Sequence, residues 1–350
     1  MFPEWSWVLG LAIGASFGSF LNVVIYRLPR RISLAKPAHS FCPNCKTDLG
    51  VADLIPLLSW LFLGGKCRHC GAKIPPRYFL VELVNGGLYA YIWHLFLVAD
   101  FDVARAALAA ATASLLVAML FIDWEFYIIP DELNALLWLV GVAFNAYLIA
   151  VGHEAAFLWG IPSSLAGWLV GTGVIWGISF LGRIAFQKDA MGHGDIKMAR
   201  GIGAVLLPIG VLLTCGIAVF LGAVLGAVQV LVWRFSPEPE HPEASSRQET
   251  GESTGEGLQY DEPESIGSLL RCGLAYAVCL DIVGLFFPKL YMRVFGEDPF
   301  TSVEDDEFEV ERTMIPFGPY LAAGAIAVLL FKPQVMSWID AYSQWAFGGS

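Results

Sequence analysis

The sequence predicts an all-α protein that crosses a membrane several times. Of its 350 residues, 56% are hydrophobic and only 15% are charged, whereas soluble domains carry about 25% charged residues. The mean hydropathy is +0.61, and apolar runs long enough to cross a bilayer recur along the chain. The net charge of −11 comes largely from acids gathered in 237–264 and 297–311, and no polybasic tract indicates nucleic-acid binding.

About eight apolar stretches are candidate membrane spans, since a span needs about 20 mostly apolar residues. They are residues 5–26, 78–99, 104–123, 133–151, 159–182, 198–213, 214–233 and 315–332. Only a weak break around Thr214–Gly216 separates the sixth from the seventh. The apolar run within 266–296 is interrupted by Asp281, so we expect an interfacial or re-entrant hairpin there instead of a crossing.

Basic residues predict the orientation of these spans. We do not expect the first span to be a cleavable signal, because it lacks a positive start and a small-residue cleavage site. It ends in Arg27, Arg30 and Arg31. By the positive-inside rule the N-terminus then faces outward and loop 28–77 lies in the cytoplasm. Loop 183–200 is also basic, with Lys197 and Arg200 at its end, whereas loop 152–158 has no lysine or arginine.

This pattern divides the chain into five parts. We expect a first transmembrane helix, a cytoplasmic zinc-binding loop, a transmembrane core, a cytoplasmic insertion with an acidic linker, and a last helix with its tail. Their predicted bounds are 1–27, 28–77, 78–234, 235–312 and 313–350.

Four of the seven cysteines form two Cys-x-x-Cys pairs in the loop 28–77. The pairs are Cys42–Cys45 and Cys67–Cys70. Disulfides are rare in the cytoplasm, and two such turns brought together supply the four thiolates of a structural zinc site. With all four positions filled, the zinc is expected to fold the loop and not to perform chemistry. The remaining cysteines lie in apolar stretches and are expected to pack as small hydrophobic residues.

Two aspartates lie where apolar runs meet polar loops. Asp123 ends the third run, and Asp195 follows Gly192-His-Gly194 at the start of the sixth. A carboxylate next to hydrocarbon is costly and marks a functional site, and the predicted topology puts both at the cytoplasmic side. Two carboxyls that share a proton around a water can hydrolyse an amide. Gly192 and Gly194 would allow a substrate strand or a second helix to approach closely.

Other acids and other functions remain open from the residues alone. Asp131 is placed as a helix N-cap but is also a candidate partner of Asp195. Glu82 lies about one turn inside the second span near Arg77, which allows an ion pair or a substrate or cofactor contact. A proton-coupled transporter could use Asp123 and Asp195 as a relay, although transporters usually place their sites near the midplane. A third alternative is a non-catalytic zinc-bearing scaffold.

The chain resembles the bacterial type IV prepilin peptidases, the leader peptidase and N-methyltransferase enzymes of pilus and type II secretion systems. The resemblance covers most of the chain outside 236–312, and the order and spacing of its segments are specific. The segments are Gly14–Pro29, Cys42–Cys70, Pro76–Glu82, Ile122-Asp123 with Ile129-Pro-Asp131, Gly192-His-Gly-Asp195-Ile-Lys197 and Ile315-Pro-Phe-Gly-Pro-Tyr320.

The resemblance implies an intramembrane aspartic protease of the Gly-x-Gly-Asp type, with Asp123 and Asp195 as the catalytic pair. It implies residence in the inner membrane, and substrates that are prepilins and pseudopilins, whose short basic leader is cut at the cytoplasmic face. Glu125, Asp131 and Glu132 are expected to attract that leader. It further implies N-methylation from S-adenosylmethionine, for which no binding motif is legible, and contact with pilus or type II secretion assembly components.

Overall fold

The computed structural model describes six stretches of the chain. They are residues 2–37, 39–152, 160–187, 191–235, 265–295 and 316–347. Within these stretches the protein is helical. Its β-structure there is limited to two isolated antiparallel bridges. Most of the expected cytoplasmic insertion, 236–264 and 296–312, lies outside the described residues, as does Ile315 of the last matched segment.

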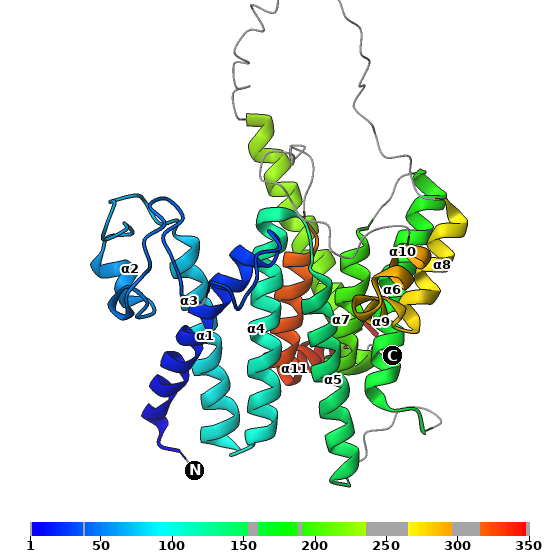
Figure 1. Cartoon of the computed structure of the whole chain (residues 1–350). Coiled ribbons are helices and arrows are strands. Elements are labelled where there is room, and N and C mark those ends of the chain that lie inside the picture. The colour runs from blue at the N-terminus through cyan, green and yellow to red at the C-terminus, as the bar shows by residue number, and fades with distance from the viewer. Residues whose placement is uncertain are drawn as a thin grey trace, which may run out of the picture.

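The helices form a bundle with their long axes roughly aligned (Figure 1). Among the described residues, six helices are long and apolar enough to cross a membrane when α7 is counted once, which confirms an all-α polytopic fold. The principal helices are α1 (Trp7–Arg27), α3 (Arg77–Ile92, continued by a π-helical stretch Trp93–Ala99), α4 (Val103–Phe126), α5 (Asp131–Ala150), α6 (Ser163–Phe186), α7 (His193–Phe235) and α11 (Gly318–Phe347). Three shorter helices, α8 (Ile266–Ala277), α9 (Leu280–Phe286) and α10 (Pro288–Phe295), flank the bundle.

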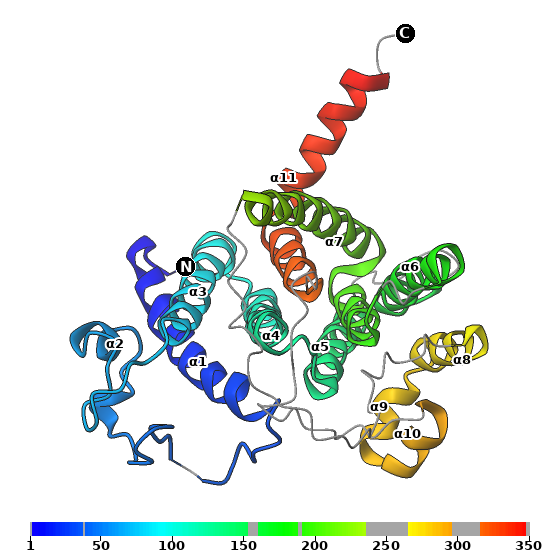
Figure 2. The same cartoon turned by 90° about the horizontal axis from the view of Figure 1, so that it is seen from above.

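Helices α1 and α3 pack closely because glycines line one face of α1. A Cβ atom added at Gly10 would lie 2.8 Å from the Tyr89 carbonyl oxygen, and one at Gly18 would lie 2.7 Å from Glu82 Cα. The Asn85 side chain donates a 2.7 Å hydrogen bond to the Gly14 carbonyl. Small residues are the usual means of close helix packing in membranes. Seen from above, this pair forms one side of the molecule, next to α4 (Figure 2).

The long helix α7 reverses direction at Leu207–Pro208. Leu207 is non-helical, with φ 67° and ψ 176°, and Pro208 provides no backbone N–H to continue the helix. A Cβ added at Gly171 would contact the Ala199 carbonyl and lie 3.2 Å from Val211 Cγ2, so residues on both sides of the break pack against the same face of α6. The expected break at Thr214–Gly216 is therefore wrong, because α7 is interrupted earlier, at Leu207–Pro208.

Helices α8 to α10 fold back against α6 and α7. The axes of α8 and α9 are bent by 79°, so they do not form one straight crossing. Tryptophan indoles of α6 fasten α8: Trp176 Nε1 donates to the Leu269 carbonyl at 2.9 Å, and Trp168 Nε1 donates to the Ala277 carbonyl at 3.0 Å. The described part of the insertion is thus an ordered helical layer on the core.

Candidate active site

Asp123 and Asp195 lie together at one end of the bundle. Asp123 is in the last turn of α4 and Asp195 in the first turn of α7. They are 6% and 8% exposed, and their carboxylates are close enough to interact electrostatically. Asp195 Oδ1 is buried and has no hydrogen-bond partner in the described part of the chain. A buried carboxylate oxygen without a partner is unusual and is available to a water or a shared proton.

Glycines close the space around both carboxylates. A Cβ added at Gly318, the first residue of α11, would lie 2.5 Å from Asp123 Oδ2 and 2.9 Å from Ile129 Cδ1. A Cβ at Gly194 would lie 3.1 Å from Ile129 Cβ, whereas one at Gly192 would meet only Asp195 Oδ2 at 3.4 Å. Sequence reasoning missed Gly318 as a site residue. The signal was the Pro-Phe-Gly-Pro run at the start of the last span.

Asp131 is held in an ion pair and is not the N-cap of α5. The N-cap is Pro130, and Asp131 is the first helical residue. Lys197 Nζ lies 2.7 Å and 2.8 Å from the two Asp131 carboxylate oxygens, and Tyr291 Oη donates to Oδ2 at 2.9 Å. The Lys197 ammonium also lies over the Tyr276, Tyr291 and Phe295 rings, 5.4 to 5.9 Å from their centroids. The Asp131 carboxylate therefore neutralises the buried Lys197 ammonium.

Arg200 forms a second buried ion pair with the flanking layer. Its guanidinium meets the Asp281 carboxylate through two bonds of 2.6 and 2.7 Å and also donates to the Tyr276 carbonyl at 3.2 Å. The Tyr276 hydroxyl lies 2.9 Å from His193 Nδ1. The expectation that Lys197 and Arg200 belong to a basic loop is wrong, because both are buried in α7. They tie the helix that carries Asp195 to α8, α9 and α10.

Glu82 and Arg77 do not form the ion pair that their spacing allows. Arg77 pairs with Glu125 at the end of α4, while Glu82 Oε2 accepts a 2.7 Å hydrogen bond from the Leu57 backbone N–H. Glu132 pairs with Arg31 at 2.6 Å. All three acids expected to attract a basic leader, Glu125, Asp131 and Glu132, are therefore paired with cations of the protein itself.

The four loop cysteines converge into one cluster. Their sulfur atoms all lie within 4.8 Å of one another, and Cys42 Sγ and Cys70 Sγ are 3.9 Å apart. Zinc–sulfur bonds of about 2.3 Å in a tetrahedron place the sulfurs about 3.8 Å apart. The residue after each pair has a positive φ, 57° at Lys46 and 70° at Gly71. These donors and this spacing fit a tetrahedral metal ion.

The turns around the cysteines favour the thiolate form at most of the four positions. The Cys70 backbone N–H lowers the pKa of Cys67, and the Asn44 side chain lowers the pKa of Cys70. At Cys42 the Cys45 backbone N–H acts in the same direction, but burial and the neighbouring thiols raise the pKa to about 11. A bound divalent cation would stabilise the thiolates, which are the form that ligates metals.

Comparison with known proteins identifies the family. The Bacterial Peptidase A24 N-terminal domain matches residues 12–96, and the Type IV leader peptidase family matches residues 110–227. A Myxococcus xanthus protein named prepilin leader peptidase/N-methyltransferase is 32% identical over 100% of this chain and 96% of its own length. A protein of the same name from Stutzerimonas stutzeri is 36% identical over 63% of this chain and 80% of its own length.

A third relative with that name, from Klebsiella pneumoniae, is 36% identical over 55% of this chain and 82% of its own length. No solved structure matches the chain. Near-complete mutual coverage with the Myxococcus xanthus protein extends the likeness from the cysteine loop to the last helix. The chain therefore belongs to the prepilin leader peptidase/N-methyltransferase family.

Proposed function

We propose that this protein cuts the leader from prepilins or pseudopilins with Asp123 and Asp195 and then methylates the new N-terminal amine. The observation that carries the peptidase half is the meeting of two buried carboxylates at one end of the bundle, with Asp195 Oδ1 unpartnered within the described residues. Their place at helix ends, not at the middle of the spans, favours a protease over the alternative of a proton-coupled transporter.

The carboxylates would act on a water held between them. The ionised carboxyl removes a proton from the water as its oxygen attacks the scissile carbonyl carbon, and the protonated carboxyl donates to the carbonyl oxygen. The proton gained from the water then passes to the leaving amine. Because close carboxyls titrate as one unit, neither role is given to one residue. The Gly318 and Gly192 amides lie beside Asp123 and Asp195 and would hold the carboxylates in position.

The cysteine cluster fits a structural zinc ion. Four sulfurs fill a tetrahedron, so no ligand position remains for a water or a substrate. We propose that Cys42, Cys45, Cys67 and Cys70 bind zinc and that the ion fixes the loop between α1 and α3. The loop and the aspartates lie at the same end of the bundle, since Arg77 at the start of α3 pairs with Glu125 at the end of α4.

We further infer that this end faces the cytoplasm of the bacterial inner membrane. The buried Arg27 side chain donates to the carbonyls of Ser33, Pro37 and His39. Arg30 and Arg31 follow it at the same helix end. Basic residues of this kind are retained on the cytoplasmic side. A prepilin helix entering from the lipid would then present its leader junction level with the two aspartates.

Conservative neutralisation tests the peptidase assignment. Full-length Asp123→Asn and Asp195→Asn variants in liposomes are mixed with a prepilin, and leader release is followed by mass. Each change alone is expected to abolish cleavage, because one carboxylate cannot both accept and donate the protons. Glu132→Gln, which removes an acid from a half-exposed ion pair at the same end, should cleave normally. Cleavage by either aspartate variant would overturn the assignment.

A further inference from the structure

A run of apolar side chains lies exposed on the cysteine loop, between the two Cys-x-x-Cys pairs. It consists of Leu54, Ile55, Leu58, Leu61 and Phe62, which are between 37% and 84% exposed. The last three belong to the short helix α2 (Leu58–Phe62). Single exposed apolar residues are ordinary on a protein surface, but a contiguous group of them marks a place where something binds.

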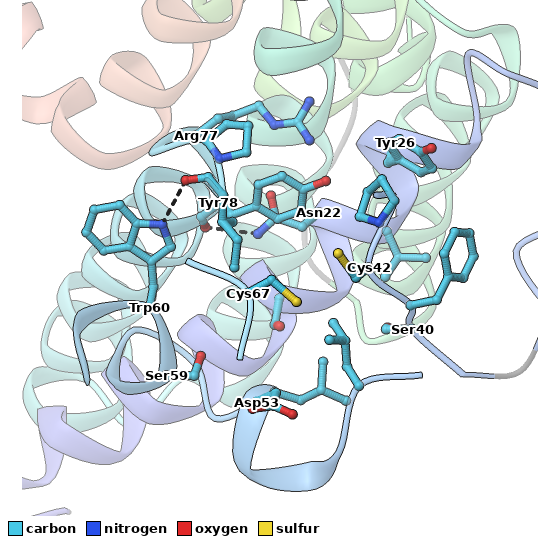
Figure 3. A pocket seen from close by; sticks show the side chains of 18 of the residues that line it. Asn22, Tyr26, Ser40, Cys42, Asp53, Ser59, Trp60, Cys67, Arg77 and Tyr78 are labelled. Carbon is cyan, nitrogen blue, oxygen red and sulfur yellow. Dashed lines mark hydrogen bonds between the residues drawn. The ribbon is translucent and has the colours of Figure 1, made fainter. Parts of the chain in front are cut away.

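The helix α2 turns its polar and aromatic side chains toward the protein. Trp60 Nε1 donates a 3.4 Å hydrogen bond to the Ile74 carbonyl, and the centroids of the Trp60 and Phe79 rings are 5.1 Å apart. Trp60 and Ser59 line a pocket between the cysteine loop and the ends of α1 and α3, and Figure 3 shows both side chains at its wall. The inward side of α2 is therefore fixed.

The outward side of α2 is entirely apolar. Leu58, Leu61 and Phe62 are three and four positions apart, so they share one face of the helix. A helix of a loop in water shows the opposite distribution, with apolar residues inward and polar residues outward. The outward face of α2 therefore suits an apolar surrounding.

A hydrogen bond fixes the level of this face along α3. The Leu57 backbone N–H, just before α2, donates to Glu82 Oε2 at 2.7 Å. Glu82 lies five positions after Arg77, the first residue of α3, which is about 7.5 Å along the helix axis. The bond thus holds the start of α2 beside the first turns of a membrane span. Segments that lie in a membrane interface are buried about 5–10 Å at the boundary between headgroups and acyl chains.

Exposed apolar residues of α3 continue the same surface. Leu80, Leu83 and Val84 are 40–45% exposed, next to the side of α3 that carries Phe79 and Glu82. Both overall views place α2 at the outer edge of the molecule, beside α3 (Figure 1, Figure 2). The outward face of α2 is therefore continuous with the surface that a membrane-spanning α3 presents to lipid.

Two lysines border the apolar run. Lys66 follows Phe62 by four residues and is joined to Lys73 by an antiparallel backbone bridge, and both lysines are exposed. Basic residues beside an apolar face are typical of segments that lie on anionic lipid. Their charge complements the headgroups that would surround the run.

We propose that this outward face of the cysteine loop is inserted among the acyl chains of the membrane leaflet at the aspartate end of the bundle. The loop is then held on two sides, by Trp60 and Leu57 against the start of α3 and by the apolar run against the bilayer. Its partner on the outward side is phospholipid and not another protein chain. The inference does not depend on the proposed catalytic roles.

Photo-crosslinking identifies what covers this face. The full-length protein in phospholipid nanodiscs carries benzoylphenylalanine in place of Phe62 or, as a control, in place of Asp48, an exposed polar residue of the same loop. Position 62 should give phospholipid adducts, identified by mass, about tenfold more often than position 48. Adducts mainly with a second copy of the chain or with added prepilin would overturn the proposal, as would equal lipid adducts at the two positions.

Hydrogen exchange tests the same face in case the bulky replacement at position 62 unfolds the protein, which thermal unfolding would reveal. Amides of α2, such as the Leu63 N–H on the Ser59 carbonyl, should be protected in nanodiscs, because a helix of five residues is not stable in water by itself. Leu61→Asp should speed their exchange about tenfold, since a carboxylate is costly among acyl chains, whereas Leu61→Met should not. On a surface open to water, Leu61→Asp would leave the exchange unchanged, and that result would refute the insertion.

Discussion

At the scale of single residues, the closest constraint on the site is Gly318. A methyl group there would force the Asp123 carboxylate to move, because a Cβ would lie 2.5 Å from one of its oxygens. Gly192 flanks the other aspartate with more room, since its added Cβ would be 3.4 Å from Asp195 Oδ2. The two glycines therefore make a matched pair for testing how tightly the carboxylates are held.

Gly318→Ala is expected to lower the rate of leader cleavage about 100-fold, because displacement of a catalytic group by about 1 Å costs that much. Gly192→Ala should lower it only a few-fold. Initial rates on one prepilin, with each variant verified by thermal unfolding, provide the comparison. Equal rates for the two variants would show that the close contact at Gly318 does not position Asp123.

Asp131→Asn distinguishes the two aspartates that sequence reasoning left as alternative partners of Asp195. Asp131 neutralises Lys197, so the substitution should destabilise the protein yet retain measurable cleavage at low temperature. Asp123→Asn should retain none at any temperature. If the outcomes were reversed, Asp131 and not Asp123 would belong to the catalytic pair.

At the scale of the elements, the flanking layer α8 to α10 supports the helix that carries Asp195. The buried pair Arg200–Asp281 has side chains 0% and 3% exposed. Removing one partner of a buried pair costs about 3–5 kcal/mol, because the other charge is left unbalanced. Asp281→Asn should therefore lower the free energy of unfolding by about that amount, as measured in mixed micelles.

The matched control is Glu132→Gln, whose pair with Arg31 has side chains 27% and 32% exposed. A surface pair of this kind contributes about 0–1 kcal/mol. If both variants lost the same stability, the layer would not be held by its buried charge. A larger loss in Asp281→Asn would show that this part of the insertion belongs to the folded core.

Zinc removal should act on one element without unfolding the rest. A chelator strong enough to strip a site of four thiolates is expected to release the cysteine loop and make it sensitive to protease, while the helices keep their circular dichroism signal. The zinc content by mass spectrometry gives the control. A protein purified without chelator that contains no zinc, or a loop that stays protected after zinc loss, would contradict the proposed site.

At the scale of the whole molecule, the proposed orientation rests on hydropathy and basic residues, and it can be tested in cells. Gly152→Cys should react with a membrane-impermeant thiol reagent added outside, and Gln187→Cys should not. Gly152 follows the end of α5 and Gln187 follows the end of the next helix, α6, so the two positions are expected on opposite sides of the membrane. The unmodified protein is the background control, because the proposed orientation puts the loop cysteines inside and the other three are buried. Labelling at 187 alone would invert the orientation.

The sequence was sufficient for the polytopic helical fold and the four-cysteine cluster, which depend on composition and short spacing, and the predicted topology put Asp123 and Asp195 at one side of the membrane. It was insufficient for contacts between distant segments. Arg200 and Asp281 are 81 positions apart, so nothing local revealed that a residue counted as a loop charge is buried. Pro208 was visible, but an apolar run continues past it and hid the reversal.

The reversal at Leu207 also limits how deep Asp195 can lie. The first half of α7, His193 to Leu206, has 14 residues and is about 21 Å long, whereas the hydrocarbon core of a bilayer is about 30 Å thick. A half-helix this short cannot join the two surfaces of an ordinary bilayer. Cleavage should therefore depend on acyl-chain length and be fastest in thin membranes, where the shortfall is smallest.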